Sequence, residues 1–254
     1  MMRSLVALAA VFLLQGFAAQ AAEIRLLSAG GIRPPLEELV PQFERASGHK
    51  VELKFVGGAT MKQELEAGAT FDVVVAEAGV VDEFIKAGKL AAATRADVAR
   101  AGVGMGVRAG ARKPDIASVD AFKRALLGAK SVAYSKEGMA GQHFIGVLDR
   151  LGIRKEMEPK LIATVTNDPA RTTFVLVSRG EAEFGIAAIA TIFTPGIDLV
   201  GPIPAELQRY IQFAAAMSAA AKESKAGAEL IKFITAPGAA RVLKAKGMEP
   251  APQR

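Results

Sequence analysis

Apolar residues along this chain follow two periods that alternate almost from end to end. The run 71–75 (FDVVV) is typical of a strand buried on both faces, and the run 51–55 (VELKF) alternates like a strand with one buried face. Between the first strands, residues 36–43 place four apolar side chains on one helical face, and Gly48 ends that helix. This alternation predicts an α/β fold made of parallel β-α-β units.

The same pattern places elements along the whole chain. We predict strands at 24–27, 51–55, 71–75, 131–134, 161–165, 184–189 and 210–216, and helices at 34–47, 61–67, 80–85, 118–127, 141–151, 169–178, 224–234 and 239–246.

Two glycine-rich stretches separate these elements into two sets. They lie around Gly104 and Gly201. We predict a discontinuous first lobe (22–103 and 200–254) and an inserted second lobe (104–199), with a hinge at the two crossings, because glycine absorbs changes of backbone dihedral angle. A ligand cleft is expected between the lobes.

The first 21 residues have the three parts of a secretory signal peptide. Arg3 supplies a cationic start, residues 4–17 form an apolar run, and Ala19-Gln20-Ala21 has the small-x-small form of a cleavage site. The run is short for a membrane span. The chain has no Cys, so there is neither a lipid-accepting thiol nor a disulfide framework. We therefore expect a periplasmic protein without a membrane anchor.

Charge and aromatic content exclude one class of partner. The net charge of +6 becomes +5 once residues 1–21, with one basic and no acidic residue, are removed. Basic and acidic residues are interspersed, and two Tyr with no Trp give few platforms for stacking bases. We expect no nucleic-acid partner.

Motifs for catalysis and cofactors are missing. Residues 104–109 match the letters of GxGxx(G/A), but no helix follows them, so we expect no nucleotide cofactor. Two His and no Cys argue against a metal site; we interpret His49 as a surface residue and leave His143 open between a packed side chain and a ligand donor. Asp72 and Glu77 flank a buried strand, and without a nucleophile nearby we interpret them as structural. No catalytic residue is assigned.

Four loops that join a strand to a helix share the same local arrangement. They are 28–31 (SAGG), 57–60 (GGAT), 138–141 (GMAG) and 167–170 (NDPA). Each helix start offers unpaired N–H groups and a partial positive charge, and glycine lets an anion approach the backbone. Such residues also form ordinary turns. Two pairs of loops split between two lobes nevertheless favour a closing anion site.

The order of these segments resembles a known family. Residues 28–31, 43–55, 57–60 and 68–75, with 113–116, 121–127 and 244–247 further on, are similar to periplasmic molybdate-type substrate-binding proteins of ABC importers over nearly the whole mature chain. The resemblance implies a two-lobed type II periplasmic binding protein fold, no catalysis and an inner-membrane ABC permease as partner.

The chain departs from the molybdate members in its cleft loops. Those members supply Ser hydroxyls in patterns such as Ala-Ala-Ser-Leu and Gly-Ser-Ser, whereas Arg33 and Arg171 follow loops here, and an Arg fork suits a carboxylate or phosphate. We therefore expect a small anion, either a molybdate-like oxyanion or an organic carboxylate, bound by a monomer. The expected ligand-binding residues are Ser28, Gly30, Gly31, Arg33, Ala59, Thr60, Gly141, Gln142, His143, Arg171 and Thr172. The alternatives are an exported enzyme and a sensor subunit that presents its ligand to a membrane receptor.

Overall fold

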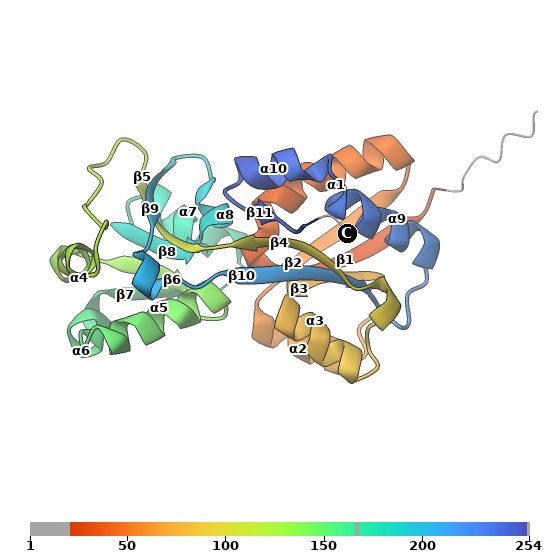
Figure 1. Cartoon of the computed structure of the whole chain (residues 1–254), viewed down its shortest axis with the longest axis horizontal. Helices are drawn as coiled ribbons and strands as arrows, with labels where there is room; N and C mark the ends of the chain where they lie inside the picture. The colour runs from red at the N-terminus through yellow and green to blue at the C-terminus, as the bar shows by residue number, and fades with distance from the viewer. Residues whose placement is uncertain (1–20, 166–167, 253–254) are drawn as a thin grey trace, which may run out of the picture.

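The structure is a computed structural model that describes residues 21–165 and 168–252. The predicted signal peptide therefore lies outside the described residues, apart from Ala21. Two sheets with helices on both faces form two lobes side by side (Figure 1). We call the six-stranded sheet and its helices the first lobe, and the five-stranded sheet and its helices the second lobe.

The first lobe contains both ends of the described chain. Its strand order is β11-β4-β10-β3-β1-β2, in which β1, β2 and β3 are parallel, β10 is antiparallel to its neighbours β3 and β4, and β11 at the edge is antiparallel to β4. In Figure 1 α1 and α10 lie above this sheet, and α2 and α3 lie below it. Its elements are β1 (Glu23–Ala29), α1 (Arg33–Ser47), β2 (Lys50–Val56), α2 (Gly58–Glu66), β3 (Val73–Glu77), α3 (Ala78–Lys86), β4 (Ala96–Ala101), β10 (Ile211–Met217), α9 (Ser224–Thr235), α10 (Ala239–Ala245) and β11 (Glu249–Pro250).

The second lobe is built from the middle of the chain. Its strand order is β7-β6-β8-β5-β9, with β6, β7 and β8 parallel and β5 antiparallel to both of its neighbours. Its elements are β5 (Val103–Arg108), α4 (Val119–Gly128), β6 (Val132–Ser135), α5 (Met139–Arg150), α6 (Arg154–Met157), β7 (Leu161–Thr164), α7 (Thr173–Ser178), β8 (Phe184–Ala188), α8 (Ile189–Ile192) and β9 (Ile197–Pro202).

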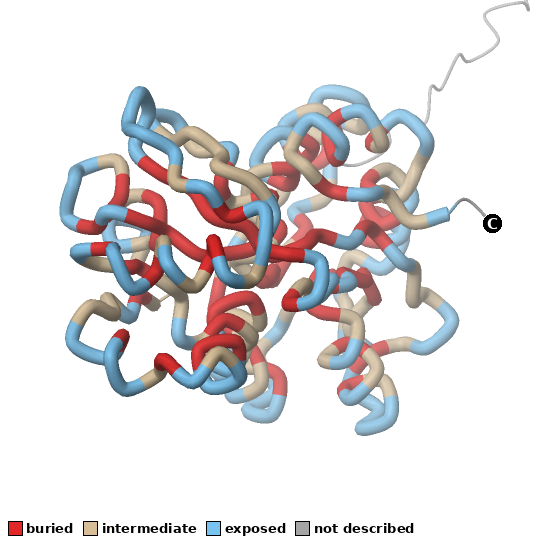
Figure 2. Tube along the Cα trace, turned by 60° about the vertical axis from the view of Figure 1, so that its left-hand side comes forward, coloured by how far each residue is buried: buried red, intermediate tan, exposed pale blue. Residues whose placement is uncertain are grey.

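Local sequence explains why these elements begin and end where they do. Strand β3 is buried along its whole length, as its run of Val predicts. Helix α1 has Pro in its first turn, where the missing N–H costs nothing, and ends at Gly48, whose φ of 77° suits glycine. Buried residues gather in the sheets and where the lobes meet (Figure 2).

The predicted hinge glycines lie elsewhere than expected. The chain passes from one sheet to the other at Gly102 and across 203–210. Gly104 lies within β5 and Gly201 lies within β9, and these two strands pair with each other. A Cβ on Gly104 would stand 2.9 Å from the Gly201 carbonyl oxygen, so glycine serves close packing there. We now propose Gly102 and 203–210 as the crossings between the lobes.

Two further predictions about elements were wrong in detail. The sheets are mixed rather than wholly parallel, and the strands β4, β5, β9 and β11 were not foreseen. The expected helix 169–178 is a 3₁₀ turn (Pro169–Arg171) followed by α7, because Thr172 between them is extended at φ −70° and ψ 161°.

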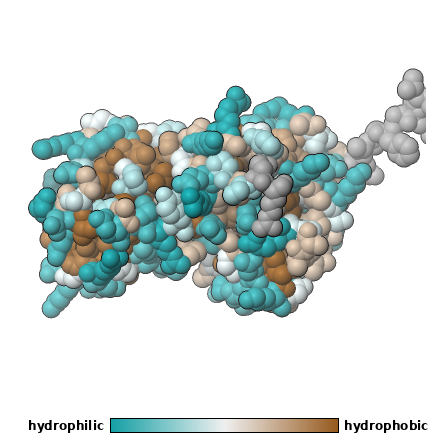
Figure 3. All heavy atoms as spheres, in the orientation of Figure 1, coloured by the Kyte–Doolittle hydropathy of each residue, from teal (hydrophilic) through white to brown (hydrophobic). Residues whose placement is uncertain are grey.

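Polar residues cover most of the face drawn in Figure 3, with hydrophobic residues showing between them. Among the described residues, the large hydrophobic side chains that are exposed are Leu127, Phe193 and Tyr210, which come from three separate segments. No helix within 21–165 or 168–252 is long and apolar enough to cross a membrane.

Candidate functional site

A pocket lies between the two lobes and has walls from both. The space inside it is about 110 Å³, enough for several water molecules or one small ligand. The first lobe contributes the ends of β1, β2 and β3 and the start of α1. The second lobe contributes the ends of β6, β7 and β8 with the starts of α5 and α7. The carboxyl ends of parallel strands thus meet here, as ligand sites in α/β sheets do.

Two of the helix starts at this pocket follow a glycine, which has no side chain to cap them. Helix α2 follows Gly57 and α5 follows Gly138, and both preceding residues are extended glycines. The first N–H groups of an α-helix have no partner inside the helix and carry a partial positive charge. The pocket can therefore offer backbone hydrogen-bond donors to an anion from both lobes.

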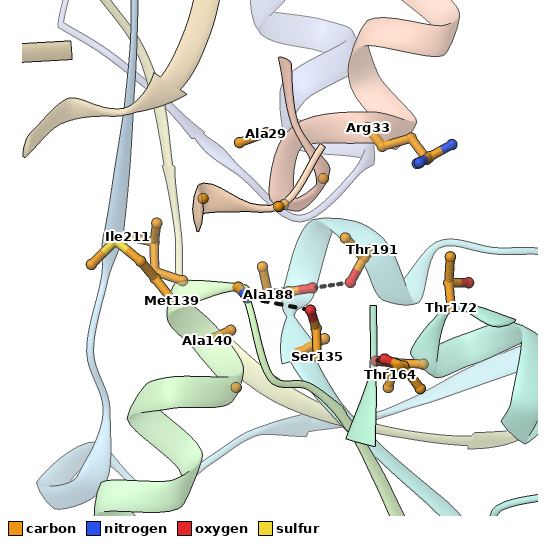
Figure 4. Close-up of a pocket in the computed structure, with 18 of the residues that line it drawn as sticks. Ala29, Arg33, Ser135, Met139, Ala140, Thr164, Thr172, Ala188, Thr191 and Ile211 are labelled. Atoms are coloured by element: carbon orange, nitrogen blue, oxygen red, sulfur yellow. Dashed lines mark hydrogen bonds between the residues drawn. The ribbon is translucent and has the colours of Figure 1, made fainter. Parts of the chain in front are cut away.

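Arg33 is the basic residue that lines the pocket in the described chain. Its side chain is 23% exposed, its guanidinium stacks 4.2 Å from the centre of the Phe55 ring, and Nη1 is 3.7 Å from Glu37 Oε1. In Figure 4 it extends from the start of α1 toward the right of the view, and Thr172 lies below it on the second-lobe side. Burial lowers the pKa of Arg33 more than Glu37 raises it. A desolvated guanidinium gains by pairing with an anion.

Hydroxyl groups line the second-lobe side. Ser135 Oγ accepts from the Gly138 N–H at 3.3 Å, and Thr191 Oγ1 donates to the Ala188 carbonyl at 2.8 Å (Figure 4). Thr164 and Thr173 lie 3.1 Å apart, oxygen to oxygen. These groups hold the turns that surround the pocket and still have capacity for a further hydrogen bond.

Glu77 is one of the residues that line the pocket. It is the last residue of β3 and only 7% exposed. Its Oε2 is buried without a hydrogen-bond partner among the described residues. Burial raises the pKa of Glu77, against a smaller lowering by its own backbone N–H. The interpretation of Glu77 as a structural residue does not account for this oxygen.

The other carboxylate of that pair has a clear structural role. Asp72 is 1% exposed and accepts from the backbone N–H of Arg25 at 2.9 Å, of Lys222 at 2.8 Å and of Glu223 at 3.1 Å. It thus joins three segments of the first lobe. The interpretation of Asp72 as structural agrees with this geometry.

His49 is buried, so the prediction of a surface position was wrong. It is 7% exposed, its Nδ1 accepts from the Ala22 N–H at 3.1 Å, and its Nε2 lies 3.2 Å from Glu229 Oε2. It joins the start of the described chain to α9. Within the described residues, no three His, Asp or Glu side chains could together hold a metal ion.

The structure brings five of the eleven expected ligand-binding residues to the pocket. They are Gly30, Gly31, Arg33, Gly141 and Thr172.

The structure places the other six outside the pocket wall. Ser28 is fully buried within β1, which runs to Ala29, and Ala59 and Thr60 lie within α2, which already begins at Gly58. His143 Nε2–H donates to the Leu207 carbonyl at 2.7 Å. Leu207 belongs to the crossing segment 203–210, so His143 is a side chain that packs against this segment. Gln142 and Arg171 are exposed, the latter on the 3₁₀ turn before α7.

Several pocket residues were missed by sequence reasoning. Ser135, Thr164, Thr173 and Thr191 were not foreseen, and Glu77 was noticed but given no role in the site. Ser135, Thr164 and Glu77 each end a parallel strand, and that position was the available signal.

Comparisons with known proteins agree with this architecture. The family model of bacterial extracellular solute-binding proteins matches residues 24–249. An aconitate isomerase from Pseudomonas sp is 30% identical over 235 residues, covering 90% of this chain and 88% of that protein. A molybdate-binding protein from Azotobacter vinelandii is 28% identical over 235 residues, covering 91% of each.

A solved structure shows the same fold. The periplasmic molybdate-binding protein of Azotobacter vinelandii has a TM-score of 0.76 at 20% identity, and the match covers 91% of this chain and 100% of that one. These findings confirm the resemblance to molybdate-type substrate-binding proteins and the two-lobed α/β fold.

Proposed function

The chain belongs to the family of bacterial extracellular solute-binding proteins, and from that premise we propose that it captures a small organic anion between its lobes and presents it to an ABC permease. The observation that carries this proposal is the pocket whose walls combine Arg33 with two helix starts that follow glycine. The proposed setting is the periplasm, which the predicted signal peptide supports. The proposed form is a monomer.

The chemistry of the pocket favours a carboxylate over a tetrahedral oxyanion. Val56, Met139, Phe174, Ile211 and Phe213 give much of the wall an apolar character. A carbon skeleton fits such a surface, whereas molybdate needs hydrogen-bond donors on every side. One relative is named for aconitate, a small tricarboxylate, and another for molybdate. Aconitate is therefore the first ligand to test.

Calorimetric titration of the mature protein with cis-aconitate, other small carboxylates, molybdate and sulfate tests the ligand class. We expect saturable binding of a carboxylate and a smaller radius of gyration in X-ray scattering when the ligand is bound, because lobe closure buries it. Binding of molybdate without any carboxylate would overturn the proposed ligand class. No binding across the panel would contradict anion capture itself.

Two arginine variants form a matched pair. Arg33→Ala removes the charge that lines the pocket and should weaken binding by about 2–5 kcal/mol, the range for breaking a desolvated charge pair. Arg171→Ala removes an exposed charge on the neighbouring 3₁₀ turn and should leave affinity unchanged. Arg33→Lys keeps the charge without the planar fork and should fall between wild type and Arg33→Ala. Equal affinities in all four proteins would remove Arg33 from the site.

A second candidate function is conversion of the bound ligand. The isomerase among the relatives raises it, and in this chain the observation that favours it is the unpartnered carboxyl oxygen of Glu77 in the pocket of the described chain.

A further inference from the structure

The proposed capture of an anion gives the carboxyl group of Glu77 no role. An ionised carboxylate in a closed pocket repels an anionic ligand, and burial without a partner is costly even for the neutral acid. Glu77 Oε2 has neither a hydrogen bond nor solvent contact among the described residues. A group in that condition within a ligand pocket is typical of an acid or base held ready for chemistry.

The position of Glu77 suits a reaction at the carbon skeleton of the ligand. Glu77 comes from the first lobe at the end of β3 and is paired in the sheet register with Phe213 of β10, which also lines the pocket. The anion-binding donors are elsewhere, at the starts of α2 and α5 and on Arg33. If those donors hold the carboxylates, the part of the ligand left for Glu77 is its carbon chain.

We propose that Glu77 is a catalytic base that moves a proton between two carbon atoms of a bound unsaturated carboxylic acid. This rests on the proposed function, since it requires the small carboxylate to bind in this pocket. The pocket would then isomerise its ligand.

The proposed step balances without an added reactant. The Glu77 carboxylate takes a proton from the CH₂ next to the double bond, and the electrons of that C–H bond form a new double bond. The old double bond gives its electrons to the conjugated carboxylate, where Arg33 and the helix N–H groups stabilise the charge. Protonated Glu77 then returns the proton to the far carbon of the three-carbon unit. For aconitate the product is again aconitate, with its double bond moved and free to take the other geometry.

The surroundings of Glu77 support this role. Arg33 is the other charged residue lining the pocket in the described chain, and Glu137 contacts Gly57 at the pocket edge. Burial raises the pKa of Glu77, which makes its carboxylate a stronger base than an exposed one. Closure of the lobes excludes water, which would otherwise protonate the carbanion at random.

The experiment follows conversion of cis-aconitate to its trans isomer by proton NMR, with binding measured in parallel by calorimetry. We expect wild-type protein to convert it. Glu77→Gln keeps the shape of the side chain but accepts no proton, and should lose at least about 100-fold in rate. It should bind cis-aconitate at least as tightly as wild type, because the neutral amide lacks the charge that repels an anion. Glu77→Asp retains a carboxyl group and should keep a measurable rate.

Controls separate this inference from the proposed function. Glu66→Gln changes an exposed carboxylate at the end of α2 and should convert at the wild-type rate. Wild-type protein that binds cis-aconitate without converting it would overturn the inference and leave anion capture standing. Glu77→Gln that converts at the wild-type rate would also overturn it. Absence of binding by folded wild-type protein would overturn both.

Discussion

Two glycines on α5 should respond to the same substitution in opposite directions. Gly141 lies in the first turn of the helix and in the pocket wall, and a Cβ added there would stand 1.9 Å from the Ser135 carbonyl oxygen and 2.8 Å from the Ser135 carbonyl carbon. Those atoms are backbone at the end of β6, so no rotamer change relieves the clash. Gly146 lies about one and a half turns further along the helix and is exposed, and a Cβ added there would have nothing within 4 Å among the described residues.

The size of the two effects follows from these surroundings. Gly141→Ala must push α5 away from β6, and overpacking of this kind costs about 1–3 kcal/mol or more. Gly146→Ala adds no contact and removes backbone entropy from the unfolded chain, so it should stabilise by about 0.5–1 kcal/mol. The two variants should therefore differ by about 1.5–4 kcal/mol, which in a protein of this size is about 3–16 °C in Tm.

Urea unfolding followed by circular dichroism measures both variants against wild type, and calorimetry measures their ligand affinity. Gly141→Ala should also bind ligand more weakly, because the displaced helix start carries donors to the pocket. Gly146→Ala should bind normally. Equal stability of the two variants would show that α5 does not lie against Ser135 and would refute the close approach.

Three further predictions concern the contact between the lobes at Gly57, the buried carboxyl group of Glu77 and the structural carboxylate of Asp72. Gly57→Ala would bring a Cβ within 2.1 Å of Glu137 Oε2 and 2.8 Å of Glu137 Cβ, so X-ray scattering should show a more open protein, and ligand binding should be weaker. Adding Glu137→Gly to this variant should restore closure. As a control, Gly58→Ala should stay closed, because its Cβ would be 3.6 Å from the nearest backbone oxygen. Burial raises the pKa of Glu77 in the folded protein, so its contribution to the free energy of unfolding is present below its pKa in the unfolded chain and is lost as pH rises through its pKa in the folded protein. In urea titrations the free energy of unfolding of Glu77→Gln, relative to that of wild type, should therefore grow with pH. Asp72→Ala leaves three backbone N–H groups without their acceptor and should lower the free energy of unfolding, measured in the same urea titrations, by at least about 2 kcal/mol.

Much of the fold follows from local patterns in the sequence. The buried run that becomes β3, the apolar face of α1 and the stop at Gly48 are each set by neighbours in sequence, and the structure has them as predicted. The strands β4 and β9 were missed because their burial is partial and irregular, with exposed or half-buried residues along them. Strand β5 was missed although it is buried, because glycines at alternate positions hide its pattern. Pairing across the sheet forms them, and pairing partners lie far away in the chain.

The site was less predictable because it depends on where strands end to within one or two residues. Strand β1 continues to Ala29, so Ser28 is enclosed in the sheet and the pocket begins one residue later than expected. Helix α2 begins at Gly58, so Thr60 belongs to the helix body rather than to the loop. Side chains at strand ends alternate between the two faces, and a shift of one residue therefore moves a hydroxyl from the pocket into the core.

With the proposed role of Glu77, a binding site and a catalytic site would differ by one side chain. A closing pocket already holds its ligand in one orientation and keeps water away, and proton transfer at carbon needs both. The same fold therefore accommodates a molybdate-binding protein and an aconitate isomerase among the relatives of this chain. In the described part of this chain the end of β3 supplies a buried carboxyl with an unpartnered oxygen, so the isomerisation assay on Glu77→Gln decides on which side of that division the protein lies.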